Sequence, residues 1–129
     1  MFSVEQIKEA HSKVKSGADF PAYIKEIKSL GVTHYETYVA DGHIDYHGGS
    51  GYTAKVPAKY DALVIADTAS KEEFIEELKA HQQGKTDFLT FITRCAKFGI
   101  EKWSISMDKM TCTYFNKAGN VILVEAIPQ

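Results

Sequence analysis

Two stretches of this chain, DFPAYIKEIKSLGV at residues 19–32 and DFLTFITRCAKFGI at residues 87–100, carry its strongest structural signal. They align without a gap when the sequence is shifted by 68 positions, and the alignment continues to Val56 and Val124. Seven of the 38 aligned pairs are identical, so the relation rests on which positions match. Because self-similarity at a fixed shift marks repeated structural units, we predict an internal duplication.

Each copy of the repeat predicts two helices followed by three strands. Apolar residues recur at helical spacing in both stretches, and each stretch has a glycine where the chain leaves the helix. Upstream, Ser3 and Ser70 each precede a Gln or Glu by three residues, which is the capping-box pattern of a helix start. Alternating apolar and polar residues then predict strands, the first of each half at residues 32–39 and 100–107.

Short turns join these strands, so neighbouring strands are expected to be antiparallel. We therefore predict an α+β fold in which four helices cover one face of a mainly antiparallel sheet. The halves are residues 1–56 and 70–127, and residues 57–69 connect them. A chain of 129 residues has the usual size of one domain, so we expect residues 1–129 to form a single domain. Within the connector, Ala62–Ala66 could form a seventh strand.

The composition argues against several classes of function. Lys and Arg number 15 against 17 Asp and Glu, so the chain lacks the basic surface that attracts nucleic acids and anionic membranes. No apolar run reaches the length of about 18 residues that a spanning helix needs, and the N-terminal sequence has no signal-peptide pattern. We expect a cytoplasmic protein with no nucleic-acid or membrane partner. The two cysteines, Cys95 and Cys112, are expected to be buried and reduced.

The side chains with the most varied chemistry lie on one face of the first predicted hairpin. Period-two alternation assigns Tyr35 and Tyr46 to the core face and places three histidines, two carboxylates and one tyrosine on the opposite face. Two strand registers are compatible with the turn. Imidazole and carboxylate groups can bind divalent metals or act as acids and bases, so this face is the candidate ligand, metal or catalytic site. The alternative is a solvated face with ordinary charge pairs. The six residues are His34, Glu36, Tyr38, His43, Asp45 and His47.

Two registers differ in which side chains of this face lie opposite each other. In the first, His34 opposes His47 and Glu36 opposes Asp45. In the second, Glu36 opposes His47 and Tyr38 opposes Asp45. Both keep all six side chains on the same face, because a shift by a whole pair preserves the side.

Two further features leave their roles open. His11 and His81 lie near the ends of the first and third helices, where they could flank a pseudo-symmetric pocket or simply favour the negative end of the helix dipole. The last strand, Val121–Val124, is apolar on both faces, which is typical of a strand buried on both sides. Helices cover one side, so we expect the other to be covered by a second copy, giving a homodimer through the sheet, or by residues 57–69.

Four stretches resemble a known family. They are HSKVKSGADF at residues 11–20, YVADGH at 38–43, AHQQGKTD at 80–87 and KMTCTY at 109–114. Together they resemble the YbcV-like family of small bacterial and prophage-encoded proteins of unknown function, whose members are often labelled phage envelope proteins. The resemblance implies a bacterial or prophage origin and brings no established reaction or catalytic residue. Its label implies a virion role.

From these features we expect a non-enzymatic binding or accessory protein without a cofactor, acting on a small ligand or as a homodimer. The duplicated scaffold and the doubly apolar last strand favour this function. The first alternative is a small enzyme that depends on a divalent metal or on acid–base chemistry at the first hairpin. The second alternative is a component of a phage virion.

Overall fold

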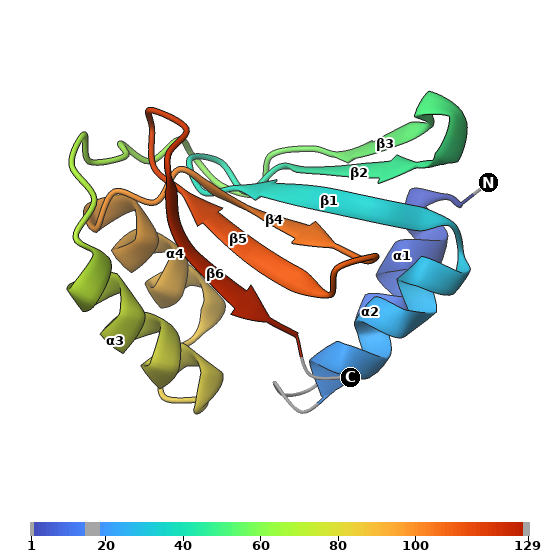
Figure 1. Ribbon diagram of the computed structural model, residues 1–129, viewed down its shortest axis with the longest axis horizontal. Coiled ribbons are helices and arrows are strands. Elements are labelled where there is room, and N and C mark those ends of the chain that lie inside the picture. Colours follow the sequence, from blue (N-terminus) through green and yellow to red (C-terminus); the bar gives the residue numbers. More distant parts are fainter. Residues whose placement is uncertain (1, 15–18, 128–129) are drawn as a thin grey trace.

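The computed structural model describes residues 2–14 and 19–127 (Figure 1). Within these residues, the first half comprises α1 (Val4–His11), α2 (Phe20–Ser29), β1 (Val32–Tyr38), β2 (Ile44–Gly48) and β3 (Thr53–Val56), with a 3-10 turn, η2 (Gly49–Gly51), between β2 and β3. The second half repeats this order with α3 (Lys71–Gln82), α4 (Phe88–Lys97), β4 (Lys102–Ser106), β5 (Thr111–Phe115) and β6 (Val121–Ala126). The predicted α+β fold is confirmed.

The six strands form one sheet in the order β3-β2-β1-β4-β5-β6, and every neighbouring pair is antiparallel. The two halves meet at its centre, where β1 pairs with β4 and Glu36 lies opposite Ser104. Ser104 follows Glu36 by 68 positions, the same shift that aligns the two stretches of sequence. A two-fold axis through this pair would produce that register. The common origin of the halves stays a prediction.

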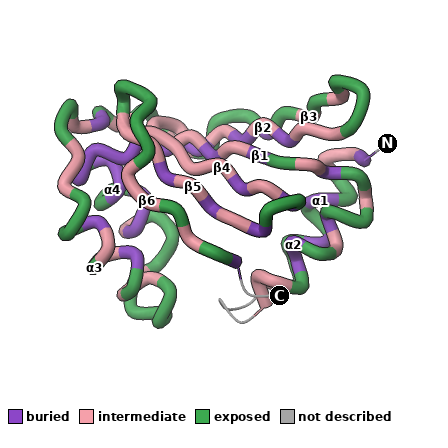
Figure 2. The backbone as a smooth tube through the Cα atoms, in the orientation of Figure 1, coloured by how far each residue is buried: buried purple, intermediate pink, exposed green. Residues whose placement is uncertain are grey.

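All four helices lie on one face of the sheet, as two pairs at its two ends (Figure 1). We call this the helix face and the opposite one the outer face. The first pair packs together and against β1 and β3, whereas α3 and α4 pack against each other. Burial alternates along the strands, because every second side chain points to the helices (Figure 2). On the helix face Tyr35, Tyr46, Ile105 and Tyr114 are each no more than 6% exposed.

The two predicted capping boxes have different outcomes. The Ser3 hydroxyl accepts a hydrogen bond from the Gln6 N–H at 3.2 Å, and the Gln6 side chain accepts one from the Ser3 N–H at 2.8 Å, so the first box is confirmed. Ser70 is the N-cap of α3, but its side chain makes no capping hydrogen bond. Its N–H donates instead to the Phe98 carbonyl at 2.9 Å, which removes the donor that a capping box would use.

The connector between the halves is not a strand. Leu63 N–H donates to the Ala40 carbonyl at 2.6 Å and Ala66 N–H donates to the Ala96 carbonyl at 3.0 Å. These partners lie in a hairpin turn and in α4, so the segment has no strand beside it on which a ladder could form. The suggested seventh strand at Ala62–Ala66 is therefore wrong.

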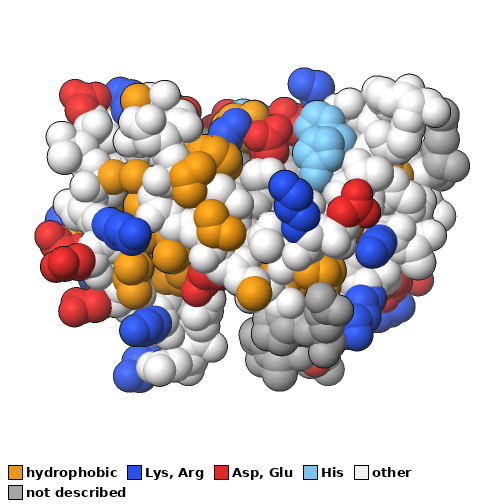
Figure 3. All heavy atoms as spheres, in the orientation of Figure 1, with side chains coloured by type: hydrophobic (Ala, Val, Ile, Leu, Met, Phe, Trp, Pro, Cys, Tyr) orange, Lys and Arg blue, Asp and Glu red, His pale blue; other side chains and the backbone are white. Residues whose placement is uncertain are grey.

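The prediction that the last strand is buried on both sides is also wrong within this chain. β6 is an edge strand, and Val121 and Val124 are 56% and 54% exposed. Leu123, which pairs with Tyr114, packs against the core from the helix face. The connector runs to α4 and leaves the outer face of β6 open, as the hydrophobic side chains over β6 in Figure 3 show. A homodimer through this strand stays a prediction.

Gly99, between α4 and β4, packs against the connector at a point where a side chain has no room. Its φ is +81°, and an added Cβ would lie 2.6 Å from the Thr68 carbonyl oxygen and 2.7 Å from the Ala69 Cα. Both contacts are with backbone, which cannot rotate away as a side chain could. Gly119 has a similar φ of +85° but nothing within 4 Å of its added Cβ.

We therefore expect Gly99→Ala to destabilise the protein more than Gly119→Ala. Both variants carry the cost of a left-handed backbone, about 1–2 kcal/mol, and only the first must also displace the connector. Urea unfolding at 25 °C measures both free energies. Equal losses would contradict the close packing of the connector against Gly99.

Candidate functional site

The outer face of the first hairpin brings the predicted residues together. β1 and β2 pair with His34 opposite His47 and with Glu36 opposite Asp45, which is the first of the two registers expected from the sequence. The His34 and His47 rings stack with centroids 4.3 Å apart and an angle of 8° between their planes. Burial, followed by the neighbouring His47, lowers the pKa of His34. Histidine side chains are visible in Figure 3 on the side of the sheet away from the helices.

The rest of this face is organised by stacking and ion pairs. The Tyr38 and His43 rings stack at 4.2 Å, and His43 Nδ1 lies 2.6 Å from Asp41 Oδ1. The pKa of Asp41 is lowered by hydrogen bonds from the His43 backbone and ring. Lys102 Nζ lies 2.7 Å from Glu36 Oε2 and 5.5 Å from the Tyr38 ring centroid. The hydrogen bond with Glu36 raises the pKa of Lys102.

These contacts do not form a metal site. Among the described residues, no group of three or more His, Cys, Asp or Glu side chains could hold a metal ion. Glu36 is paired with Lys102 on one oxygen and lies 3.7 Å from His47 Nε2 on the other. Two buried polar atoms of this face, His47 Nε2 and Asp45 Oδ1, have no hydrogen-bond partner in the described part of the chain. The role of the six residues as a ligand site stays a prediction.

A different site lies on the helix face. A cavity of about 880 Å³ separates the two helix pairs, with β1, β2, β4 and β5 as its floor. Protein pockets for small ligands have volumes of roughly 300–1,000 Å³. Trp103 lies on the central strand β4 and points to this face, yet it is only partly buried. Phe88, which also lines the cavity, is 45% exposed. Both aromatic rings therefore remain partly accessible to solvent.

Equivalent positions of the two halves line the cavity. His11 and His81, for which a pocket or a helix-dipole role was left open, both line it from the ends of α1 and α3. Twelve other lining residues form six pairs that the shift of 68 aligns, one member from each half. The pairs are Phe20 and Phe88, Tyr23 and Phe91, Tyr35 and Trp103, Thr37 and Ile105, Ile44 and Cys112, and Tyr46 and Tyr114.

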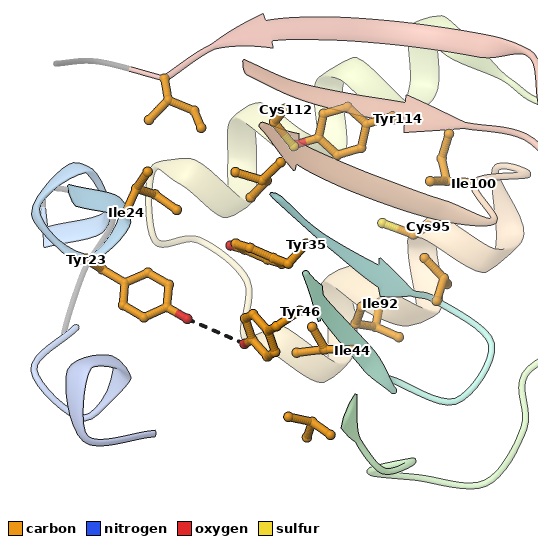
Figure 4. Packing of buried hydrophobic residues seen from close by; sticks show 14 of the residues in the cluster. Tyr23, Ile24, Tyr35, Ile44, Tyr46, Ile92, Cys95, Ile100, Cys112 and Tyr114 are labelled. Atoms are coloured by element: carbon orange, nitrogen blue, oxygen red, sulfur yellow. Dashed lines mark hydrogen bonds between the residues drawn. The ribbon is translucent and has the colours of Figure 1, made fainter. Parts of the chain in front are cut away.

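The first half lines the cavity with hydroxyl groups. The Tyr23 hydroxyl, on α2, lies 3.5 Å from the Tyr46 hydroxyl, on β2, and the Tyr35 ring lies beside them (Figure 4). Burial raises the pKa of all three tyrosines, so their hydroxyls are protonated at neutral pH and can donate hydrogen bonds. The two halves thus differ in polarity, since Phe91 and Trp103 stand at the positions aligned with Tyr23 and Tyr35.

Ionisable groups lie on two sides of the cavity. Lys59 and His11 line it near the first half, and partial burial lowers the pKa of both. Each has a further cationic neighbour, because Lys8 acts on Lys59 and Lys59 acts on His11. On the side of the second half, Glu125 accepts a hydrogen bond from the Gln82 amide at 3.2 Å.

The cysteines behave as the sequence indicates. Both are buried and free. Burial raises the pKa of Cys112, on the cavity floor, to about 12, and it also raises the pKa of Cys95. A thiol of such high pKa is protonated at neutral pH and is a poor nucleophile.

Sequence reasoning placed Tyr35 and Trp103 in the core, and Tyr35 is buried there with Trp103 packed against it. It missed that both side chains also line a cavity. Alternation identifies the face of a strand, and it cannot say whether a helix or empty space lies above that face. The signal that was available is the alignment itself, because equivalent positions of two related halves converge near a two-fold axis.

The model of a family described as "Protein of unknown function (DUF1398)" matches residues 8–126 of the chain. No curated protein matches it. The family match does not test the YbcV-like resemblance or the phage-envelope label. Across the described ranges, every helix is too short or too polar to cross a membrane.

We expect stoichiometric Zn²⁺ or Ni²⁺ to leave the melting temperature of the protein unchanged. A metal bound to the native state would raise it, and the outer face lacks a cluster of three ligands. Differential scanning fluorimetry with and without a chelator measures the shift. A rise in melting temperature that disappears in the His34→Ala/His47→Ala variant would restore the metal hypothesis.

Proposed function

We propose a function for this chain, which belongs to the DUF1398 family of proteins of unknown function: it is a non-enzymatic protein that binds a small molecule in the cavity between its helix pairs. The observation that carries this proposal is the partly buried Trp103 on a central strand, within a cavity of about 880 Å³. Close packing over the whole helix face would bury an indole at this position. An open aromatic floor favours a ligand.

The chemistry of the lining supports binding over catalysis. The ionisable groups deepest in the cavity are phenols and the Cys112 thiol, and burial raises the pKa of Tyr35, Tyr46 and Cys112. An activated nucleophile needs a lowered pKa or an adjacent base. Protonated phenols serve instead as fixed hydrogen-bond donors that orient a ligand.

A second candidate function is acid–base catalysis on the outer face of the first hairpin. It is favoured by His47 Nε2 and Asp45 Oδ1, which are buried and have no hydrogen-bond partner among the described residues. A substrate could satisfy both atoms. We rank it second because stacking and ion pairs already occupy their neighbours His34 and Glu36.

We also propose that the protein is a homodimer joined through β6. This edge strand carries no Lys, Arg or Pro, and Val121 and Val124 are exposed on it. Unprotected edges of this kind pair readily with another strand. The opposite edge is protected, because β3 has only four residues, carries Lys55 and is followed by Pro57.

A cytoplasmic location, a prophage origin and a virion role are further proposals, and they rest on the sequence alone.

Binding in the cavity is tested with N-phenyl-1-naphthylamine, a neutral dye whose fluorescence rises in apolar surroundings. We expect Thr37→Phe, which adds a ring to the cavity floor, to weaken dye binding by at least about tenfold. Thr113→Phe is the matched control, because Thr113 points to the outer face of β5. Dye titration measures the affinities, and circular dichroism checks that both variants fold. Equal affinities of the two variants would contradict a site in the cavity.

The dimer is tested by sedimentation velocity at high micromolar concentration. We expect a dimer for the natural chain and a monomer for Val124→Lys, because a buried lysine would oppose strand pairing. Thr113→Lys places the same charge on the neighbouring strand, opposite Val124, and should leave the dimer intact. A natural chain that sediments as a monomer would overturn the proposal.

A further inference from the structure

We infer that the cavity takes an aromatic carboxylic acid, with its carboxylate among the hydroxyls and basic side chains of the first half and its ring among the aromatic side chains of the second. The inference rests on the proposed function and adds the class of ligand. It comes from a difference between the two halves of the lining, which their alignment makes visible.

The difference is a one-sided loss of hydroxyl groups. Tyr23 is aligned with Phe91, and Thr37 is aligned with Ile105. Each of these pairs has a hydroxyl in the first half and a hydrocarbon in the second. A cavity with equivalent halves would suit a symmetric ligand, whereas these two pairs give the first half more hydroxyl groups. We call the two ends the polar and the apolar end for this difference, although Gln82, Gln83 and Thr86 also line the second.

The polar end presents donors. The Tyr23 and Tyr46 hydroxyls lie 3.5 Å apart, at the outer limit of a mutual hydrogen bond, and Tyr35 lies in the same group (Figure 4). A carboxylate can accept from two such donors at once. Hydrogen bonds to an ionised acceptor are shorter and about twice as strong as those between neutral groups.

The charges of the lining favour the same orientation. Lys59 and His11 line the cavity near this donor group. The His11 ring lies 5.3 Å from the Tyr23 ring, and burial, followed by the nearby Lys59, lowers the pKa of His11. His11 is therefore a neutral hydrogen-bonding group at neutral pH, and an anion bound here would face the Lys59 ammonium. Among the described lining residues the one carboxylate is Glu125, which belongs to the second half and is bound by Gln82. Its charge disfavours an anion at that end.

The apolar end is built for a ring. The His81 ring stacks on Phe91 with centroids 4.3 Å apart, and its Nδ1 lies 3.1 Å from the Thr86 carbonyl oxygen. The Trp103 ring lies 6.1 Å from Phe91 and 6.1 Å from Tyr114, measured between centroids. The partly open indole can therefore accept an aromatic ring in an offset or edge-on contact.

The experiment compares three probes of one shape: 2-naphthoate, 2-naphthamide and 2-naphthylmethylammonium. Quenching of Trp103, the single tryptophan of the chain, reports binding directly, and displacement of the neutral dye provides a second readout. We expect the carboxylate to bind at least about tenfold more tightly than the amide, and the ammonium to bind most weakly. The Lys59→Gln/His11→Gln variant should lose this preference and keep its affinity for the amide.

Lys55→Gln is the matched control, because it removes a lysine on β3 that pairs with Asp45 outside the cavity. It should leave all three affinities unchanged. An amide or ammonium that binds as tightly as the carboxylate would overturn the ligand class. Equal changes in carboxylate affinity in the Lys59→Gln/His11→Gln and Lys55→Gln variants would overturn it as well. If the neutral dye binds and no naphthalene probe does, the ligand class is wrong and the binding function stands. If neither binds, the proposed function fails with it.

Discussion

The structure depends on the pairing of β1 with β4 at the centre of the sheet. This antiparallel contact joins the two halves with Glu36 opposite Ser104, its counterpart in the repeat. Each half packs its own helices against its own strands, as Phe74 against Tyr114 and Phe91 against Trp103 show for the second half. An antiparallel join therefore places the two helix pairs at opposite ends of the sheet (Figure 1). Over the middle of the sheet the two helix pairs then stand apart, with the cavity between them. The cavity is a consequence of how the halves are joined.

The same join separates two kinds of chemistry. On the outer face, charged side chains form ion pairs and aromatic rings stack on each other. An example is the ion pair of Glu36 with Lys102 from the other half. On the helix face, burial keeps phenols and thiols neutral, so the groups available to a ligand are donors with fixed positions. Both faces contain titratable residues, and the helix face combines them with a cavity of about 880 Å³. This contrast is the reason for placing the function in the cavity.

Local patterns predicted much of the architecture. The Ser3 capping box and the shared face of the six residues on the first hairpin depend on residues close in sequence. The choice between the two registers of that hairpin was left open and is made by the structure. Predictions were wrong for segments whose hydrogen-bond partners lie far away in the sequence. The Ser70 N–H donates a hydrogen bond to the Phe98 carbonyl, so the predicted capping box does not form. The connector forms hydrogen bonds with a hairpin turn and with α4, so the predicted seventh strand does not form. These contacts join segments that no local pattern relates.

The sequence by itself determined the order of helices and strands, the α+β class and the face on which each strand residue lies, because periods of 2 and 3.6 residues are properties of a single segment. It also brought His34, Glu36 and His47 to one face. Only the tertiary structure decided that β6 lies at an edge and that Tyr35 and Trp103 line a cavity. Those outcomes depend on which strands become neighbours and on how far apart the helix pairs stand, and both are set by contacts between the halves.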